Sequence, residues 1–173
     1  MKDKQNAVIN EKLSMMLNEF LKQIDTEYRE MFRELAEFAI KLGYKPQKTK
    51  TKLPGVIFFN RMTMQSILRL ESNADSDINK GPGIRLKFYA TETYSQMFRN
   101  SIKKVIEEFN GRYTGCYGCG KCKSGIQGYS YVYDDGKTVF RCGTELISLQ
   151  GFEKKHIEEI KTLLFTQAEY FIK

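Results

Sequence analysis

The sequence predicts an α+β domain in which helices pack on an antiparallel sheet of about five strands. Apolar residues recur at helical spacing near both ends of the chain and again in its middle, and short alternating segments lie between these stretches. The alternating segments are joined by short links, which favours antiparallel pairing. A length of 173 residues suits one domain, so we expect residues 1–173 to form a single unit.

The first helical pattern covers about residues 5–42. Its apolar side chains recur every three or four positions, as at Ile9 and Phe20, and charged side chains occupy the opposite positions. Gly43 follows the last apolar residue and is a common stop signal for a helix. The pattern therefore predicts a long N-terminal amphipathic helix, or two helices with a break near Asp25.

Three strand patterns follow a polar segment, 45–55, that we expect to be a loop; they cover residues 56–60, 66–71 and 83–90. In the second and third, apolar and charged side chains alternate, with Leu68, Leu70, Ile84 and Leu86 on one face and Arg69, Glu71, Arg85 and Lys87 on the other. This alternation is typical of strands with one buried face.

Two further helices and a hairpin complete the predicted fold. Helical patterns cover about residues 94–109 and 153–172. Between them, residues 128–142 form two strand patterns around Asp135 and Gly136, a pair that favours a tight hairpin turn.

The four cysteines give the clearest chemical signal. Cys116, Cys119 and Cys122 follow one another at a spacing of three with glycines between them, and Cys142 stands at the end of the predicted hairpin. A hairpin brings its two ends together, so we expect the fourth cysteine to return beside the other three. Four thiolates complete a tetrahedral zinc site without any histidine. The sequence thus predicts a four-cysteine metal knuckle between the second helix and the hairpin, within a cysteine-rich metal-binding hairpin over residues 112–143.

Other roles for the cysteines stay open. Closely repeated Cys-x2-Cys spacing also occurs around iron–sulfur clusters, so such a cluster is the alternative cofactor to zinc. Cys116 and Cys119 have the spacing of a thioredoxin-like dithiol, although they follow a helix end rather than a strand. The remaining alternative is that the four cysteines are free thiols without a metal. A closed four-thiolate shell leaves no position for water, so a bound zinc ion would be structural.

The positive charge suggests a possible nucleic-acid partner. The formal net charge is +7, and the excess lies around the cysteines and in a short lysine tract made of Lys45, Lys48, Lys50 and Lys52. Such a tract gives non-specific, salt-sensitive affinity for phosphate groups. The aromatic residues Tyr129, Tyr131 and Tyr133 share one face of a predicted strand and could stack on bases if they were exposed. More often, such a row packs under a helix.

The sequence favours a binding or regulatory module over an enzyme. Its one histidine, His156, lies in the last helix without a partner pattern for acid–base or nucleophilic catalysis. The longest apolar run is too short to span a bilayer, and the first residues lack a secretory pattern, so we expect a cytoplasmic protein with no membrane partner. A small molecule or a protein is the expected partner, and a nucleic acid or a redox role is the alternative.

Overall fold

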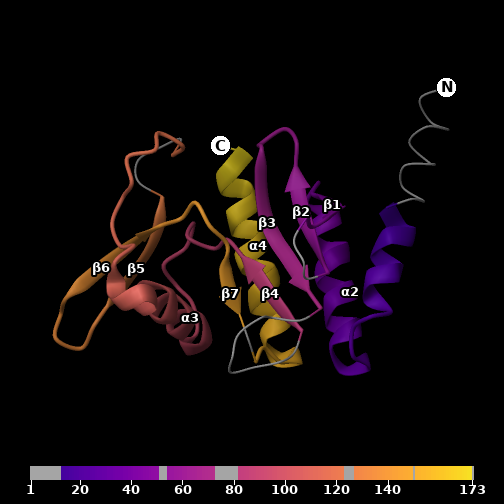
Figure 1. Cartoon of the computed structure of the whole chain (residues 1–173), viewed down its shortest axis with the longest axis horizontal. Helices are drawn as coiled ribbons and strands as arrows, with labels where there is room; N and C mark the ends of the chain where they lie inside the picture. The colour runs from indigo at the N-terminus through magenta and orange to yellow at the C-terminus, as the bar shows by residue number, and fades with distance from the viewer. Residues whose placement is uncertain (1–12, 51–53, 73–81, 123–126, 150, 173) are drawn as a thin grey trace.

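The computed structural model describes residues 13–50, 54–72, 82–122, 127–149 and 151–172. These residues form four helices, a five-stranded antiparallel sheet and a separate two-stranded sheet (Figure 1). After a first helix over residues 13–21, the elements are α2 (Thr26–Lys41), β1 (Lys45–Lys48), β2 (Gly55–Asn60), β3 (Gln65–Glu71), β4 (Gly83–Leu86), α3 (Gln96–Glu107), η1 (Glu108–Gly111), β5 (Gly128–Val132), β6 (Thr138–Cys142), β7 (Ile147–Leu149), η2 (Lys154–His156) and α4 (Ile157–Ile172). The α+β class and the antiparallel sheet are confirmed.

The N-terminal amphipathic pattern is not one long helix. The helix over residues 13–21 ends, and α2 begins at Thr26 after a turn that includes Asp25. Arg29 of α2 donates to the carbonyls of Leu21 and Ile24 at 3.1 and 3.0 Å. Carbonyl groups at a helix end lack partners within the helix, so this side chain stabilises the break that the sequence allowed near Asp25.

The five strands of the large sheet lie in the order β1-β2-β3-β4-β7, and every neighbouring pair is antiparallel. The sequence predicted a loop at β1 and no strand at β7, so both edge strands were missed. Pro46 lies in β1, where a proline is tolerated because an edge strand has one unpaired side. The flanking lysines also discourage pairing with another chain at this edge.

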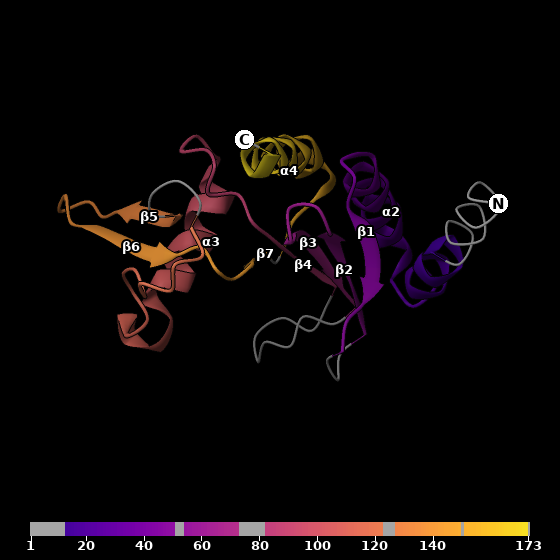
Figure 2. The same ribbon diagram turned by 90° about the horizontal axis from the view of Figure 1, so that it is seen from above.

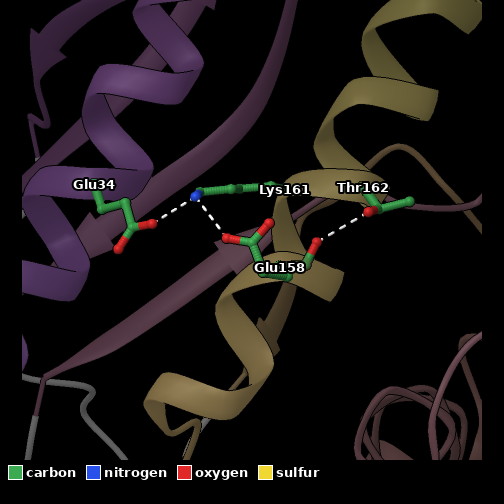
Figure 3. Close-up of polar contacts among 4 residues, drawn as sticks. All are labelled: Glu34, Glu158, Lys161 and Thr162. Carbon is green, nitrogen blue, oxygen red and sulfur yellow. Dashed lines mark hydrogen bonds and ion pairs between the residues drawn. The ribbon is translucent and has the colours of Figure 1, made fainter.

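Helices α2 and α4 cover one face of the large sheet (Figure 2). The side chains under them are buried, including Phe58 of β2, Leu68 of β3 and Leu86 of β4. The two helices are also tied to each other. Lys161 of α4 donates to a carboxylate oxygen of Glu34 on α2, and its ammonium lies 2.8 Å from Glu158 Oε1 on its own helix (Figure 3). The hydrogen bond to Glu158, and then that to Glu34, raises the pKa of Lys161.

The hairpin forms its own sheet, which corrects the prediction that it belongs to the large one. β5 and β6 pair only with each other among the described strands, and α3 packs between them and β7. The ring of Phe88 connects the two parts, because its centroid lies 5.6 Å from that of Tyr94, 5.3 Å from Phe98 and 5.1 Å from Tyr129. The chain thus has one continuous apolar core under two separate sheets.

The predicted four-cysteine metal knuckle is wrong. Within the described ranges, which include all four cysteines, no three cysteine, histidine or acidic side chains form a group that could hold a metal ion. β6 does return Cys142 to the start of the hairpin, where it pairs with Gly128. However, the Cys142 side chain is buried, whereas Cys116 and Cys119 are exposed. A metal needs all of its ligands directed at one point, and the return of the backbone does not set that direction.

Replacing Phe88 with alanine should lower the free energy of unfolding by about 3–5 kcal/mol, because it removes a fully buried ring at the junction of the two sheets. Urea unfolding followed by circular dichroism measures the change. Met62→Ala is the control, since Met62 is 94% exposed and its loss should change stability by less than about 0.5 kcal/mol. Equal losses from the two variants would show that Phe88 does not hold the two parts together.

Candidate functional site

A pocket of about 710 Å³ lies where the large sheet meets the hairpin, and we call it the sheet–hairpin pocket. Its floor comes from β2, β3 and β4, through Ile57, Arg69 and Arg85, which alternate with the buried side chains under α2 and α4. Its other walls come from the segment after β6 and from the end of the cysteine loop, residues 116–122. The lining includes four cationic side chains, namely Arg69, Arg85, Lys87 and Lys121.

Two of these cations are held by one buried carboxylate. Arg69 of β3 and Arg85 of β4 lie directly opposite each other in the sheet. Arg69 Nε lies 2.8 Å from Glu71 Oε1 in an ion pair, and Arg85 Nε donates to Glu71 Oε2 at 3.0 Å. Glu71 is only 1% exposed, whereas the Arg85 side chain is 38% exposed. The carboxylate therefore holds both arginines from a neighbouring position on the same sheet face, and Arg85 lines the pocket.

Lys87 continues the cationic row beyond β4. Its ammonium donates to Gln65 Oε1 at 3.1 Å, and only 8% of the residue is exposed. Burial lowers the pKa of Lys87; the neighbouring Cys142 opposes this shift, and the positive charge of Lys121 adds to it. Lys87 and Lys121 therefore face one pocket as like charges that an anion would stabilise.

A β-bulge places two polar side chains at the same wall. The register of β2 with β3 shifts between Phe58 and Phe59, so that Phe58 pairs with Leu68 but Phe59 pairs with Ser66. The extra residue, Ile67, is buried in the core. Because a bulge interrupts the alternation of side chains, Gln65 and Ser66 can both line the pocket.

Tyr89 and Gln127 form a neutral part of the wall. The Tyr89 hydroxyl donates to Gln127 Oε1 at 3.3 Å. Burial, and then the neighbouring Tyr170, raises the pKa of Tyr89, so its phenol stays protonated at neutral pH. The amide nitrogen of Gln127 has no hydrogen-bond partner within the described part of the chain. Gln127 lines the pocket, so an unpartnered donor lies beside it.

The cysteines divide into two pairs. Cys122 and Cys142 both line the sheet–hairpin pocket, and both affect the ionisation of Tyr89. Cys116 and Cys119 do not line it and are exposed on the cysteine loop. Bound zinc and an iron–sulfur cluster stay predictions from the sequence.

The lysine tract and the tyrosine strand are separated by the large sheet. β1, which carries Lys45 and Lys48, is at one edge of the large sheet, and β5 is in the hairpin beyond the other edge (Figures 1 and 2). Lys50 is exposed just after β1, and Lys52 lies outside the described residues.

The tyrosines do not form one exposed platform. Tyr129 is 1% exposed and packs against Phe88, so its ring belongs to the core. Tyr131 and Tyr133 contact each other, with their ring centroids 4.9 Å apart. The ammonium of Lys103 lies over both rings, at 5.8 and 5.7 Å from their centroids.

Sequence reasoning assigned a site to Cys122 and Cys142, which line the pocket, but not to the charged residues beside them. The charged residues of the predicted strands 66–71 and 83–90 were expected on the solvent side. These residues are Arg69, Glu71, Arg85 and Lys87. A signal was present, since charged residues alternate with apolar ones on two neighbouring predicted strands. It could not show that the hairpin closes over that sheet face.

Comparison with known proteins gives no relative. No family model matches the chain, and no curated protein or solved structure is significantly similar to it. In the described part of the chain, no helix has the length and apolar character needed to cross a membrane. The functional argument therefore depends on the geometry of the sheet–hairpin pocket.

The burial of the four thiols predicts their relative reactivity. Cys116 and Cys119 should react rapidly with iodoacetamide in the native, reduced protein, whereas Cys142, at 5% exposure, should react at least about tenfold more slowly, because it needs local opening. Mass spectrometry of peptides after timed alkylation measures each rate. In concentrated urea the four rates should converge. If Cys142 reacts as fast as Cys116 in the native protein, the Cys142 side chain is not buried as described.

Proposed function

We propose that this protein is a binding or regulatory module that holds a small anionic molecule in the sheet–hairpin pocket. One observation carries the proposal: four cationic side chains from β3, from the end of β4 and from the cysteine loop line a single pocket. Among the described residues, the lining contains one carboxylate, that of Glu145. The cytoplasmic location inferred from the sequence belongs to the same proposal.

The two carboxylates described beside the pocket do not cancel the charge of its four cations. Glu71, beside the arginines, and Glu145, at the rim, leave a formal charge of +2 for the four cations and these two carboxylates. Glu145 is also engaged elsewhere, since its carboxylate lies 3.7 Å from Arg141. Like charges held together at a partly closed surface repel each other, and an anionic ligand relieves that repulsion.

The size of the pocket supports a small molecule. A volume of about 710 Å³ is within the range of pockets that hold metabolites and other small ligands. The lining combines charged groups with Ile57, Met64 and Leu146, so it can contact an apolar part of a ligand as well as an anionic one. This mixture fits an organic anion better than a simple inorganic salt ion.

A nucleic acid is the weaker candidate. The proposed interface needs the lysine tract and the tyrosine strand to contact one polymer, but the other strands of the large sheet lie between β1 and β5 (Figure 1). Burial of Tyr129 removes one of the three rings from such an interface. The lysine tract alone offers only non-specific affinity.

A panel of anions tests the proposal on the purified full-length protein. Isothermal titration with citrate, sulfate and phenyl phosphate at low ionic strength should find at least one that binds with a Kd below about 1 mM, which corresponds to about 4 kcal/mol. Lys121→Gln should weaken that binding about two- to fivefold, because an exposed charge contact contributes about 0.5–1 kcal/mol.

The matched control is Lys45→Gln, which makes the same chemical change on β1, outside the pocket. It should leave the affinity unchanged. The proposal fails if no anion in the panel binds, or if Lys121→Gln and Lys45→Gln have the same affinity as the unmodified chain.

A further inference from the structure

The arginine pair in the sheet–hairpin pocket is fixed before any ligand arrives. Glu71 engages Arg69 and Arg85 through their Nε atoms, and each carboxylate oxygen serves one arginine. The residue opposite Glu71 on β4 is Gly83, which has no side chain to compete for this space. Guanidinium groups anchored in this way lose little freedom on binding, and their planar forks match the oxygens of a phosphate or a carboxylate.

The charge of the site matches a ligand with two negative charges. The four cations, less Glu71 and Glu145, leave +2. A carboxylate group carries one negative charge, whereas a phosphate monoester carries close to two at neutral pH, with its second pKa at about 6. One phosphate group can therefore neutralise the pocket by itself.

The donors approach from several directions. Arg69 and Arg85 come from the sheet floor, Lys121 comes from the cysteine loop, and Thr144 comes from the segment after β6. A planar carboxylate is saturated by donors near one plane, but the three terminal oxygens of a phosphate point in different directions. Donors supplied by three separate segments thus suit a tetrahedral group better than a planar one.

The remaining space suits an organic body on that phosphate. Ile57, Met64 and Leu146 line the pocket together with the ring of Tyr89. Inorganic phosphate has no apolar surface for these side chains to contact, whereas the carbon skeleton or ring of an ester does.

From these contacts we infer that the anion is the phosphate group of a small organic monoester, held by Arg69, Arg85, Lys87 and Lys121. This inference rests on the proposed function and adds the chemical class of the ligand. The binding involves no covalent step.

Matched ligands test the inference on the full-length protein. At constant ionic strength and pH 7.5, phenyl phosphate should bind at least about tenfold more tightly than phthalate, an aromatic dicarboxylate of similar size and charge. It should also bind more tightly than inorganic phosphate, which lacks the apolar body. Isothermal titration measures all three affinities.

The protonation of the ligand provides a second readout. Between pH 5 and pH 7 the affinity for phenyl phosphate should rise about tenfold, because the monoanion becomes a dianion at a pKa of about 6. Sulfate keeps two charges over this range, so its affinity should stay within about twofold. A parallel rise for sulfate would mean that the pH dependence does not come from the second ionisation of the phosphate, and would contradict the selectivity for a phosphate dianion.

A charge-conserving variant tests the arginine fork. Arg85→Lys keeps the positive charge but loses the planar fork, so phenyl phosphate should bind at least about tenfold more weakly. The urea midpoint shows whether the variant is folded, and Lys45→Arg, which exchanges the same two residue types on β1 outside the pocket, is the folded comparison that should bind within about twofold of the unmodified chain. If Arg85→Lys does not fold, the comparison of phenyl phosphate with phthalate decides the matter alone.

The outcomes separate this inference from the proposed function. If phthalate binds as tightly as phenyl phosphate, or inorganic phosphate binds more tightly, the monoester assignment is wrong while the pocket remains an anion site. If no anion binds, both are wrong.

Discussion

Two arginines face each other across neighbouring strands, and Glu71 is the group that makes this arrangement stable. Arg69 and Arg85 are direct partners in the register of β3 with β4, where like charges destabilise a sheet. The buried carboxylate of Glu71 lies within 3.0 Å of both Nε atoms. Removing one member of such a buried ion cluster typically costs about 3–5 kcal/mol, because a charge is left buried without its partner. The positive floor of the pocket depends on this one carboxylate.

The hairpin turns that charged sheet face into a pocket. α3 and the rings around Phe88 hold β5 and β6 beside β7, and the chain leaving β6 passes over the end of the large sheet at Gly143. A side chain at Gly143 would meet the Tyr89 ring at 2.7 Å, so the close approach of this segment requires glycine. The apolar core thus sets the position of the wall, and the wall brings Cys142 and Glu145 to the cations. The packing of the apolar core around Phe88 therefore determines which charged side chains line the same pocket.

Much of the fold follows from local pattern. The helices near 94–109 and 153–172, the strands near 56–60 and 66–71, and the hairpin around Gly136 form close to where periodicity and turn residues predict them. The edge strands were missed for physical reasons. β1 contains Lys45 and Pro46, which have low strand propensity, and it is a strand only because β2 offers it hydrogen bonds. β7 has three residues, too few for a period to show.

The sequence by itself determined that this chain folds as α+β with an antiparallel sheet and that charged residues alternate along β3 and β4, because side-chain period depends only on local backbone geometry. Tertiary structure decided everything about which groups meet. The spacing of the cysteines suggested one shared site, but the folded chain directs Cys142 and Cys122 into a pocket and leaves Cys116 and Cys119 exposed. The same packing brings Lys121 to Lys87 and the arginines. The directions of side chains from distant segments depend on how whole elements pack, and no short stretch of sequence contains that information.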